Sequence, residues 1–201
     1  MKIYDVSRPI QVDMAVYKNK DFKKPSWRID TRYEDTTVNE SSLCMNLHTG
    51  THVDAPFHMI DGGTTMEDID LDLYMGRARL IDLSGVEEFI HKKDLEPHDI
   101  QPEERIIIRT RNSYSDEFDP NFVYIEEDAA AYLRDIGIKT LGIDAMSIER
   151  GKKDHPTHPI ILGAGIGVIE DMRLKDVPVG EYELRALPLR LVGAEASPVR
   201  A

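Results

Sequence analysis

Apolar residues occur in short runs along this chain, and turn-forming residues separate the runs. These runs predict strands because each is only a few residues long and most are rich in branched aliphatic side chains. The predicted strands cover residues 3–6, 41–47, 77–83, 105–110, 138–143, 167–170 and 182–192. Pro188 lies inside the last of them, and since proline cannot donate a hydrogen bond to a neighbouring strand, it favours a sheet edge or a bulge there.

The sequence indicates only two helices. Residues 126–136 begin with acidic side chains, contain three consecutive alanines and are followed by glycine, which is typical of a helix and its C-terminal cap. A shorter helix is predicted at residues 159–162. Residues 11–40 are polar and irregular, which predicts a long excursion over the surface. Because strands outnumber helices without regular alternation, we expect a β-rich mixed α/β fold forming a single domain over residues 1–201.

Charge and composition narrow the class of protein. The formal net charge is −12 over 201 residues, and a surface of this sign repels the phosphates of nucleic acids. No stretch reaches the roughly 18 consecutive apolar residues of a membrane span, and the first residues lack the pattern of a secretion signal. Cys44 is the single cysteine, which fits a reducing cytoplasm, and its apolar neighbours predict a small buried side chain. We therefore expect a cytoplasmic protein without nucleic-acid or membrane partners.

Candidate metal chemistry is concentrated in residues 47–59, which read Leu-His-Thr-Gly-Thr-His-Val-Asp-Ala-Pro-Phe-His-Met. This segment contains His48, His52, Asp54 and His58. Imidazole and carboxylate groups are the ligands that borderline divalent metals prefer. The glycine, the proline and the β-branched residues between them disfavour a helix, so we expect an extended segment that turns into a loop. Since alternate side chains of an extended chain share a face, these four even-numbered residues are predicted to converge.

Further ligands are expected elsewhere in the chain, because one short segment rarely completes a metal site. His155 and His158 lie beside two prolines at the start of a predicted helical turn, and His158 is favoured because it is nearer the apolar run that follows. Glu170 ends a strand that is predicted to be buried, where a carboxylate needs a partner such as a metal ion. His91 and His98 lie among charged residues on a solvated face and are not expected to be ligands.

The order of residues in the histidine segment is familiar. The run from His48 to His58 matches the pattern H-x-G-T-H-x-D-x-P-x-H, which resembles the signature of the cyclase-like metal hydrolases. This family includes bacterial kynurenine formamidases and isatin hydrolases. The resemblance extends over the whole chain, from Asp5-Val-Ser-Arg-Pro9 through Gly142-Ile-Asp144 to Ala196-Ser-Pro-Val-Arg200. It implies a swivelling β/β/α fold and a homodimer or a higher homo-oligomer.

The resemblance also implies a set of metals and a role for each candidate residue. Two metal ions per subunit are implied, zinc in the formamidases and manganese in isatin hydrolase. The implied ligands are His48, His52 and Asp54 for the first ion, Asp54 and Glu170 as bridging carboxylates, and His158 for the second ion. His58 matches the catalytic general acid/base of the family. The implied reaction is the attack of a metal-activated water on the carbonyl of a small aromatic amide.

One stretch departs from the pattern of the family. Formamidases carry a tryptophan that stacks on the substrate within Pro-x-Trp-Pro-Gly-Asp, whereas residues 15–20 here read Ala-Val-Tyr-Lys-Asn-Lys. We expect Tyr17 to stack on the substrate instead, in the site of its own subunit or of a neighbour. The favoured activity is that of an arylformamidase, which converts N-formylkynurenine to kynurenine and formate. The alternatives are ring opening of an isatin-like lactam, a polyketide-type cyclase or dehydratase, and a metal-stabilised binding protein without catalysis.

Overall fold

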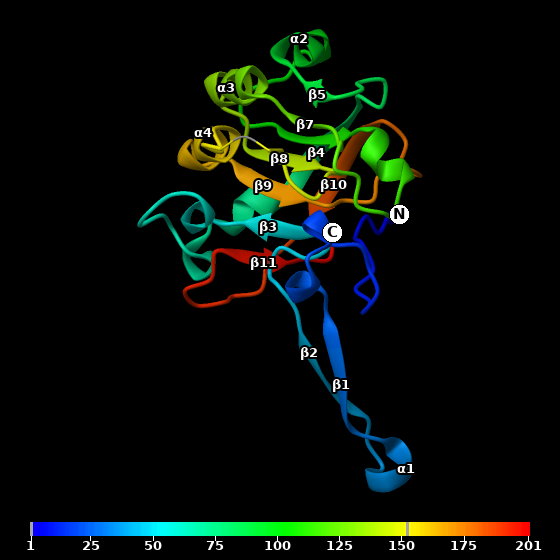
Figure 1. Cartoon of the computed structure of the whole chain (residues 1–201). Coiled ribbons are helices and arrows are strands. Elements are labelled where there is room, and N and C mark those ends of the chain that lie inside the picture. Colours follow the sequence, from blue (N-terminus) through cyan, green and yellow to red (C-terminus); the bar gives the residue numbers. More distant parts are fainter. Residues whose placement is uncertain (1, 152) are drawn as a thin grey trace.

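A seven-stranded mixed sheet forms the centre of the protein in the computed structural model, which describes residues 2–151 and 153–201. Its strand order is β10-β4-β6-β8-β9-β3-β11 (Figure 1). In that order the strands are Gly180–Arg185, Met75–Asp82, Arg105–Arg109, Thr140–Ile143, Gly167–Glu170, His52–Asp54 and Ala196–Pro198. The central strands β4, β6, β8 and β9 pair in parallel, whereas β10, β3 and β11 pair in antiparallel fashion. The predicted mixed α/β fold is therefore confirmed.

Helices α2 (Lys92–Leu95), α3 (Glu127–Ile136) and α4 (Thr157–Gly163) lie on one side of this sheet (Figure 1). A two-stranded parallel ladder, β5 (Phe89–Ile90) and β7 (Tyr124–Ile125), lies beside them. Short 3-10 helices connect the larger elements, at Tyr17–Asn19, Asp21–Lys23, Pro56–His58, Met66–Asp68, Leu71–Tyr74, Glu96–His98 and Arg111–Tyr114. This arrangement gives the sheet one face that is covered by helices and one that is covered mainly by irregular chain.

The sequence explains why α3 forms and how it packs. The Glu126 carboxylate accepts a hydrogen bond from the Glu127 backbone N–H at the helix start, and Gly137 adopts the left-handed conformation that ends it. Ala129, Ala130 and Leu133 form the buried stripe of the helix. They belong to a hydrophobic core that also contains the isoleucines of β6 and β8, so this core lies between the helices and the sheet.

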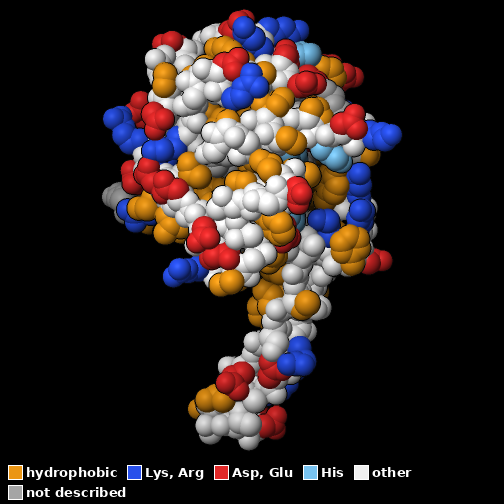
Figure 2. All heavy atoms as spheres, turned by 90° about the vertical axis from the view of Figure 1, so that its left-hand side faces the viewer, with side chains coloured by type: hydrophobic (Ala, Val, Ile, Leu, Met, Phe, Trp, Pro, Cys, Tyr) orange, Lys and Arg blue, Asp and Glu red, His pale blue; other side chains and the backbone are white. Residues whose placement is uncertain are grey.

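A long arm projects from the body of the protein (Figure 1). It consists of β1 (Ser26–Thr31), the single-turn helix α1 (Tyr33–Thr36) and β2 (Glu40–Cys44), with β1 and β2 paired in antiparallel fashion. Trp27 pairs with Leu43, and Ile29 lies two residues further along the same face. These three side chains are 55%, 45% and 49% exposed, and hydrophobic side chains are visible where the arm leaves the body (Figure 2). The arm therefore has an apolar face that nothing in this chain covers among the described residues.

The structure corrects several expectations about individual segments. Residues 3–6 form no strand, and the surface excursion predicted over residues 11–40 contains β1 and α1. The strand predicted at residues 182–192 is β10, which lies at the sheet edge and ends at Arg185, before the proline. Cys44 is exposed rather than buried, because its apolar run belongs to the arm. Within the described residues, no helix combines the length and apolarity needed to cross a membrane.

Candidate metal centre

β3 and β9 bring three side chains of the candidate site onto one face of the sheet. His52 lies opposite Glu170 in the antiparallel register, and Asp54 follows two residues later on β3. Side chains two apart on a strand share a face, and opposite residues of a ladder are neighbours. His52 Nε2 lies 3.2 Å from Glu170 Oε2 and 3.6 Å from Asp54 Oδ1. All three side chains are buried, so the sheet holds them together away from solvent.

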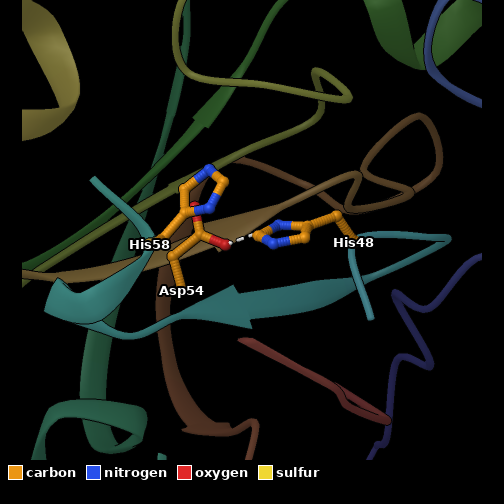
Figure 3. Close-up of side chains that lie close together, drawn as sticks. All are labelled: His48, Asp54 and His58. Atoms are coloured by element: carbon orange, nitrogen blue, oxygen red, sulfur yellow. Dashed lines mark ion pairs between the residues drawn. The ribbon is translucent and has the colours of Figure 1, made fainter. Parts of the chain in front are cut away.

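A turn and a 3-10 helix place His48 and His58 next to each other beside the Asp54 carboxylate (Figure 3). His48 lies in the turn before β3, and its Nδ1 is 3.0 Å from Asp54 Oδ1. Gly50 completes this turn with a φ of +71°, and a Cβ at that position would lie 2.7 Å from the Ile10 side chain. Pro56 starts the 3-10 helix that carries His58, whose ring centroid lies 4.1 Å from that of His48.

The first turn of α4 supplies the remaining histidine. His158 Nε2 lies 3.4 Å from Glu170 Oε1 and 3.8 Å from Asp54 Oδ2. The side chain of His158 is buried, whereas that of His155 is about half exposed and lies 3.9 Å from Glu149. The structure therefore brings His158, and not His155, to the side chains of the histidine segment.

Buried polar atoms in this cluster lack the hydrogen bonds that such atoms normally have. Among the described residues, His52 Nε2 and both carboxylate oxygens of Asp54 make no hydrogen bond of normal geometry. The polar atoms nearest to them, at 3.0 to 3.8 Å, belong to the other side chains of the cluster. His52 Nδ1 lies 2.8 Å from the Gly50 carbonyl, which favours the tautomer that donates from Nδ1 and leaves the Nε2 lone pair free. A free imidazole lone pair beside unpartnered carboxylate oxygens is a donor set that fits divalent cations, so the residues present suit a metal.

The electrostatics of the cluster also favour a cation. Burial disfavours the charged form of His52, yet the Glu170 and Asp54 carboxylates outweigh it and raise the pKa of His52 to about 9. Burial opposes the charged form of His158 as well, but Glu149 and Glu170 raise its pKa to about 10. The buried carboxylates therefore stabilise positive charge at this place, whether a proton or a metal ion carries it.

His58 differs from these two histidines. Burial is the largest influence on its imidazole and, with the positive charges of His48 and His158, lowers its pKa to about 4. Its ring lies 5.6 Å from that of His158, centroid to centroid. A neutral imidazole at this place can accept a proton, and it can equally bind a metal. Donor atoms of His48, Asp54 and His58 lie within 4.8 Å of one another, as do those of His52, Asp54 and Glu170.

The five residues predicted as metal ligands and the predicted acid/base His58 therefore lie together, with Asp54 common to both groups of donors. Tyr17 is within electrostatic range of the cluster: burial raises the pKa of its hydroxyl, and the negative charges of Glu170 and Glu149 raise it further. The Tyr17 ring contacts Phe118 and Phe122 edge-on, at centroid distances of 5.6 and 6.2 Å. His91 Nδ1 lies 3.1 Å from Asp128 Oδ1, and both side chains are partly exposed.

Sequence reasoning missed two carboxylates at the edge of the site. Glu149 is buried, and its Oε2 lies 3.1 Å from His158 Nδ1 and accepts a hydrogen bond from the His158 backbone N–H. Glu195 Oε1 lies 3.4 Å from His48 Nε2. Glu195 precedes β11, which pairs with β3, so its position depends on a strand pairing that no local pattern reveals.

The sequence is similar to that of a known protein family. The model of the family named Cyclase, described as "Putative cyclase", matches residues 4–150. This chain belongs to the cyclase family. A relative, the kynurenine formamidase of Bacillus mycoides strain KBAB4, is 37% identical over 200 residues, which are 98% of this chain and 94% of that protein. The kynurenine formamidase of Salinibacter ruber is 35% identical and covers 100% of this chain and 96% of its own.

Solved structures agree with the cyclase-family fold. A protein described as a "potential metal-dependent hydrolase with cyclase activity" superposes with a TM-score of 0.92 at 46% identity, covering 99% of this chain and 95% of the other. Isatin hydrolase A from Labrenzia aggregata, bound to benzyl benzoate, gives a TM-score of 0.82 at 19% identity, over 99% of this chain and 91% of its own. The second likeness concerns the fold alone.

Proposed function

We propose that this protein is a metal-dependent amide hydrolase of the arylformamidase type, which converts N-formylkynurenine to kynurenine and formate. The strongest support is the cluster of imidazoles and carboxylates whose buried donor atoms lack hydrogen-bond partners. Relatives called kynurenine formamidase, similar over nearly the full chain, connect such a cluster with hydrolysis of an aryl formamide.

Two zinc ions per subunit are proposed, with manganese as the alternative metal. The proposed ligands are His48, His52 and Asp54 for the first ion, Asp54 and Glu170 as shared carboxylates, and His158 for the second. Bound divalent ions supply a Lewis acid for the amide carbonyl and lower the pKa of water. Glu149 and the Gly50 carbonyl hold His158 and His52 by their Nδ1 atoms, so the Nε2 atoms face the carboxylates.

His58 is the proposed general acid/base. Its neutral imidazole, between the rings of His48 and His158, is placed to accept a proton from the attacking water. The same imidazole can then return the proton to the leaving amine nitrogen. Because His58 also fits the first group of metal donors, loss of turnover with retained metal is the observation that separates the two roles.

Tyr17 is the proposed contact for the aromatic ring of the substrate. Its ring packs edge-on against Phe118 and Phe122, which gives an apolar wall beside the metal residues of the same subunit. A phenol ring offers both an apolar face and a hydroxyl group. Tyr17 is therefore suited to hold an aromatic ring while its hydroxyl remains near the polar centre.

A homodimer is proposed on the basis of the arm. A two-stranded ribbon is only marginally stable alone in water, and the apolar face formed by Trp27, Ile29 and Leu43 is exposed. The body of the same chain has an apolar groove of about 570 Å³ near the N-terminal segment and β10, with Leu80, Ile107 and several other aliphatic side chains in its lining. The arm points away from its own body (Figure 1), so a twofold pair of copies can cover both surfaces.

We place the protein in the cytoplasm. The support is the single cysteine, Cys44, which is exposed and makes no disulfide. Free exposed thiols persist in reducing compartments. The proposed partners are accordingly a small aromatic amide and a second copy of this chain.

The test is hydrolysis of N-formylkynurenine by protein whose metal content has been measured. We expect formate release by the metal-loaded enzyme, loss of activity after chelation, and recovery when zinc or manganese is restored. Release that persists unchanged after complete metal removal would contradict the metal mechanism. Protein that binds metal but leaves this substrate intact would overturn the formamidase activity, and isatin would be the next substrate because Tyr17 replaces the family's tryptophan.

A further inference from the structure

Residues 8–24 form a strap that is fastened to the turn carrying His48. The Arg8 backbone N–H donates to Thr51 Oγ1 at 2.8 Å, and the Thr49 hydroxyl donates to the Lys23 carbonyl at 2.7 Å. Between these two bonds, the side chains of Ile10 and Met14 pack against the backbone at Gly50. The end of the strap is therefore held in a fixed place beside the metal centre.

The hydrogen bond between Thr49 and the Lys23 carbonyl places the Lys23 side chain close to His48. Its Nζ donates to Asn46 Oδ1 at 3.0 Å, and the His48 backbone N–H donates to the same oxygen at 3.1 Å. The side chain of Asn46 thus links the Lys23 ammonium group to the backbone of His48, which is a proposed metal ligand. Burial and the charge of Lys20 lower the pKa of Lys23, while the Glu170, Asp54 and Glu195 carboxylates oppose this change.

No carboxylate among the described residues lies within ion-pair distance of this ammonium group. The nearby acids have other contacts: Glu195 with His48, Asp54 with His48 and His52, and Glu170 with His52 and His158. A half-buried cation without an anionic partner is unfavourable, and an anion supplied by a ligand would relieve this cost.

We infer that Lys23 binds a carboxylate group of the substrate beside the metal centre and selects aryl amides that carry a carboxylate over those that lack one. This inference rests on the aryl formamide activity proposed above. Tyr17 begins the first of two consecutive 3-10 helices and Lys23 ends the second. One short segment thus offers an aromatic wall and a cation, which together suit an aromatic ring that carries an acidic side chain.

The experiment compares N-formylkynurenine with its carboxamide derivative, in which a neutral amide replaces the carboxylate. Lys23→Gln removes the charge and keeps a hydrogen-bond donor for Asn46. We expect the preference for carboxylate over carboxamide, measured as the ratio of kcat/KM values, to fall about tenfold, mainly through KM. Lys23→Arg keeps the charge and is expected to restore most of the preference. Lys20→Gln, an equal change of charge on an exposed residue of the same strap, is the control and should leave the ratio within about twofold of the wild type.

Each outcome bears on the inference separately from the proposed function. An unchanged ratio in Lys23→Gln, or an equal fall in Lys20→Gln, overturns the role of Lys23 while the formamidase activity stands. If Lys23→Gln lowers kcat/KM equally for both substrates and also reduces metal content, the inference is overturned as well, because the contact with Asn46 then has a structural role. Wild-type protein that hydrolyses neither substrate overturns the proposed function, and the inference with it.

Discussion

The most instructive residue to change is Glu149, which contacts no substrate in the proposed reaction and acts through His158. Its carboxylate accepts a hydrogen bond from the His158 backbone and lies 3.1 Å from His158 Nδ1. This contact fixes the tautomer with a proton on Nδ1, and a negative partner there makes Nε2 a stronger donor. Glu149→Gln keeps the size of the side chain but removes the charge. Its amide group can also donate to Nδ1, which would leave the proton on Nε2, where the metal must bind.

The size of the effect follows from this geometry. Loss of a hydrogen-bonded partner behind a metal-binding histidine costs about 10- to 100-fold in metal affinity, or about 1.4–2.8 kcal/mol. We expect Glu149→Gln to weaken the binding of one metal ion per subunit by this factor. The binding of the other ion, on the His48 side, should change much less. Competition against a chelating dye, together with the metal content of dialysed protein, measures both affinities.

A matched variant makes the result specific. Asp154→Asn removes one negative charge from an exposed side chain a few residues away, and it should leave both affinities unchanged. Thermal unfolding of the metal-free proteins checks that Glu149→Gln still folds. If folded Glu149→Gln binds both ions as tightly as the wild type, the contact does not orient His158 and the reasoning is wrong.

Four further outcomes are expected. His58→Ala should lower kcat at least about 100-fold while metal content stays at the wild-type level, and loss of metal instead would make His58 a ligand. Free metal at 100 times its Kd should stabilise the fold by about 2.7 kcal/mol, which calorimetry would record as a rise in Tm of about 5–10 °C. In sedimentation velocity, the double variant Trp27→Ser with Leu43→Ser should shift the protein toward monomer, whereas Arg28→Ser on the opposite face of the arm should not. Tyr17→Leu should raise KM for aryl formamides more than Tyr17→Phe does, and equal effects would argue against ring contact.

The local pattern of apolar residues was sufficient to predict the strands at the centre of the sheet. The apolar runs of β4, β6, β8 and β9 are buried between layers, so a short run of branched residues predicts them directly. The arm was missed for the opposite reason. Trp27 and Ile29 alternate with polar residues as in a half-buried strand, yet they lie in a polar region and none of the described residues buries them. Pattern alone cannot distinguish such a surface from a loop.

Most of the candidate site was predictable because its residues are unusual as a set, but the reason for their convergence was only partly right. Alternation along a strand brings His52 and Asp54 together, as expected. His48 arrives through a turn and His58 through a 3-10 helix, so their even numbering is incidental. The partners Glu149 and Glu195 lie in segments without a distinctive pattern, and only the register of β9 and β11 against β3 defines their surroundings.

The position of β3 between β9 and β11 has a consequence for how the protein matures. His48, Asp54 and His58 are close in the sequence, whereas the contacts that bring in Glu170 are distant, as in the bond from Thr51 to Asp171 across 120 positions. Pairings of such long range are the slow steps of folding. In a newly made chain, His48, Asp54 and His58 can therefore come together early. Glu170 joins His52 and Asp54 only when β9 pairs with β3. High-affinity uptake of the second ion is expected to coincide with the last folding step, so its binding kinetics report on completion of the native sheet.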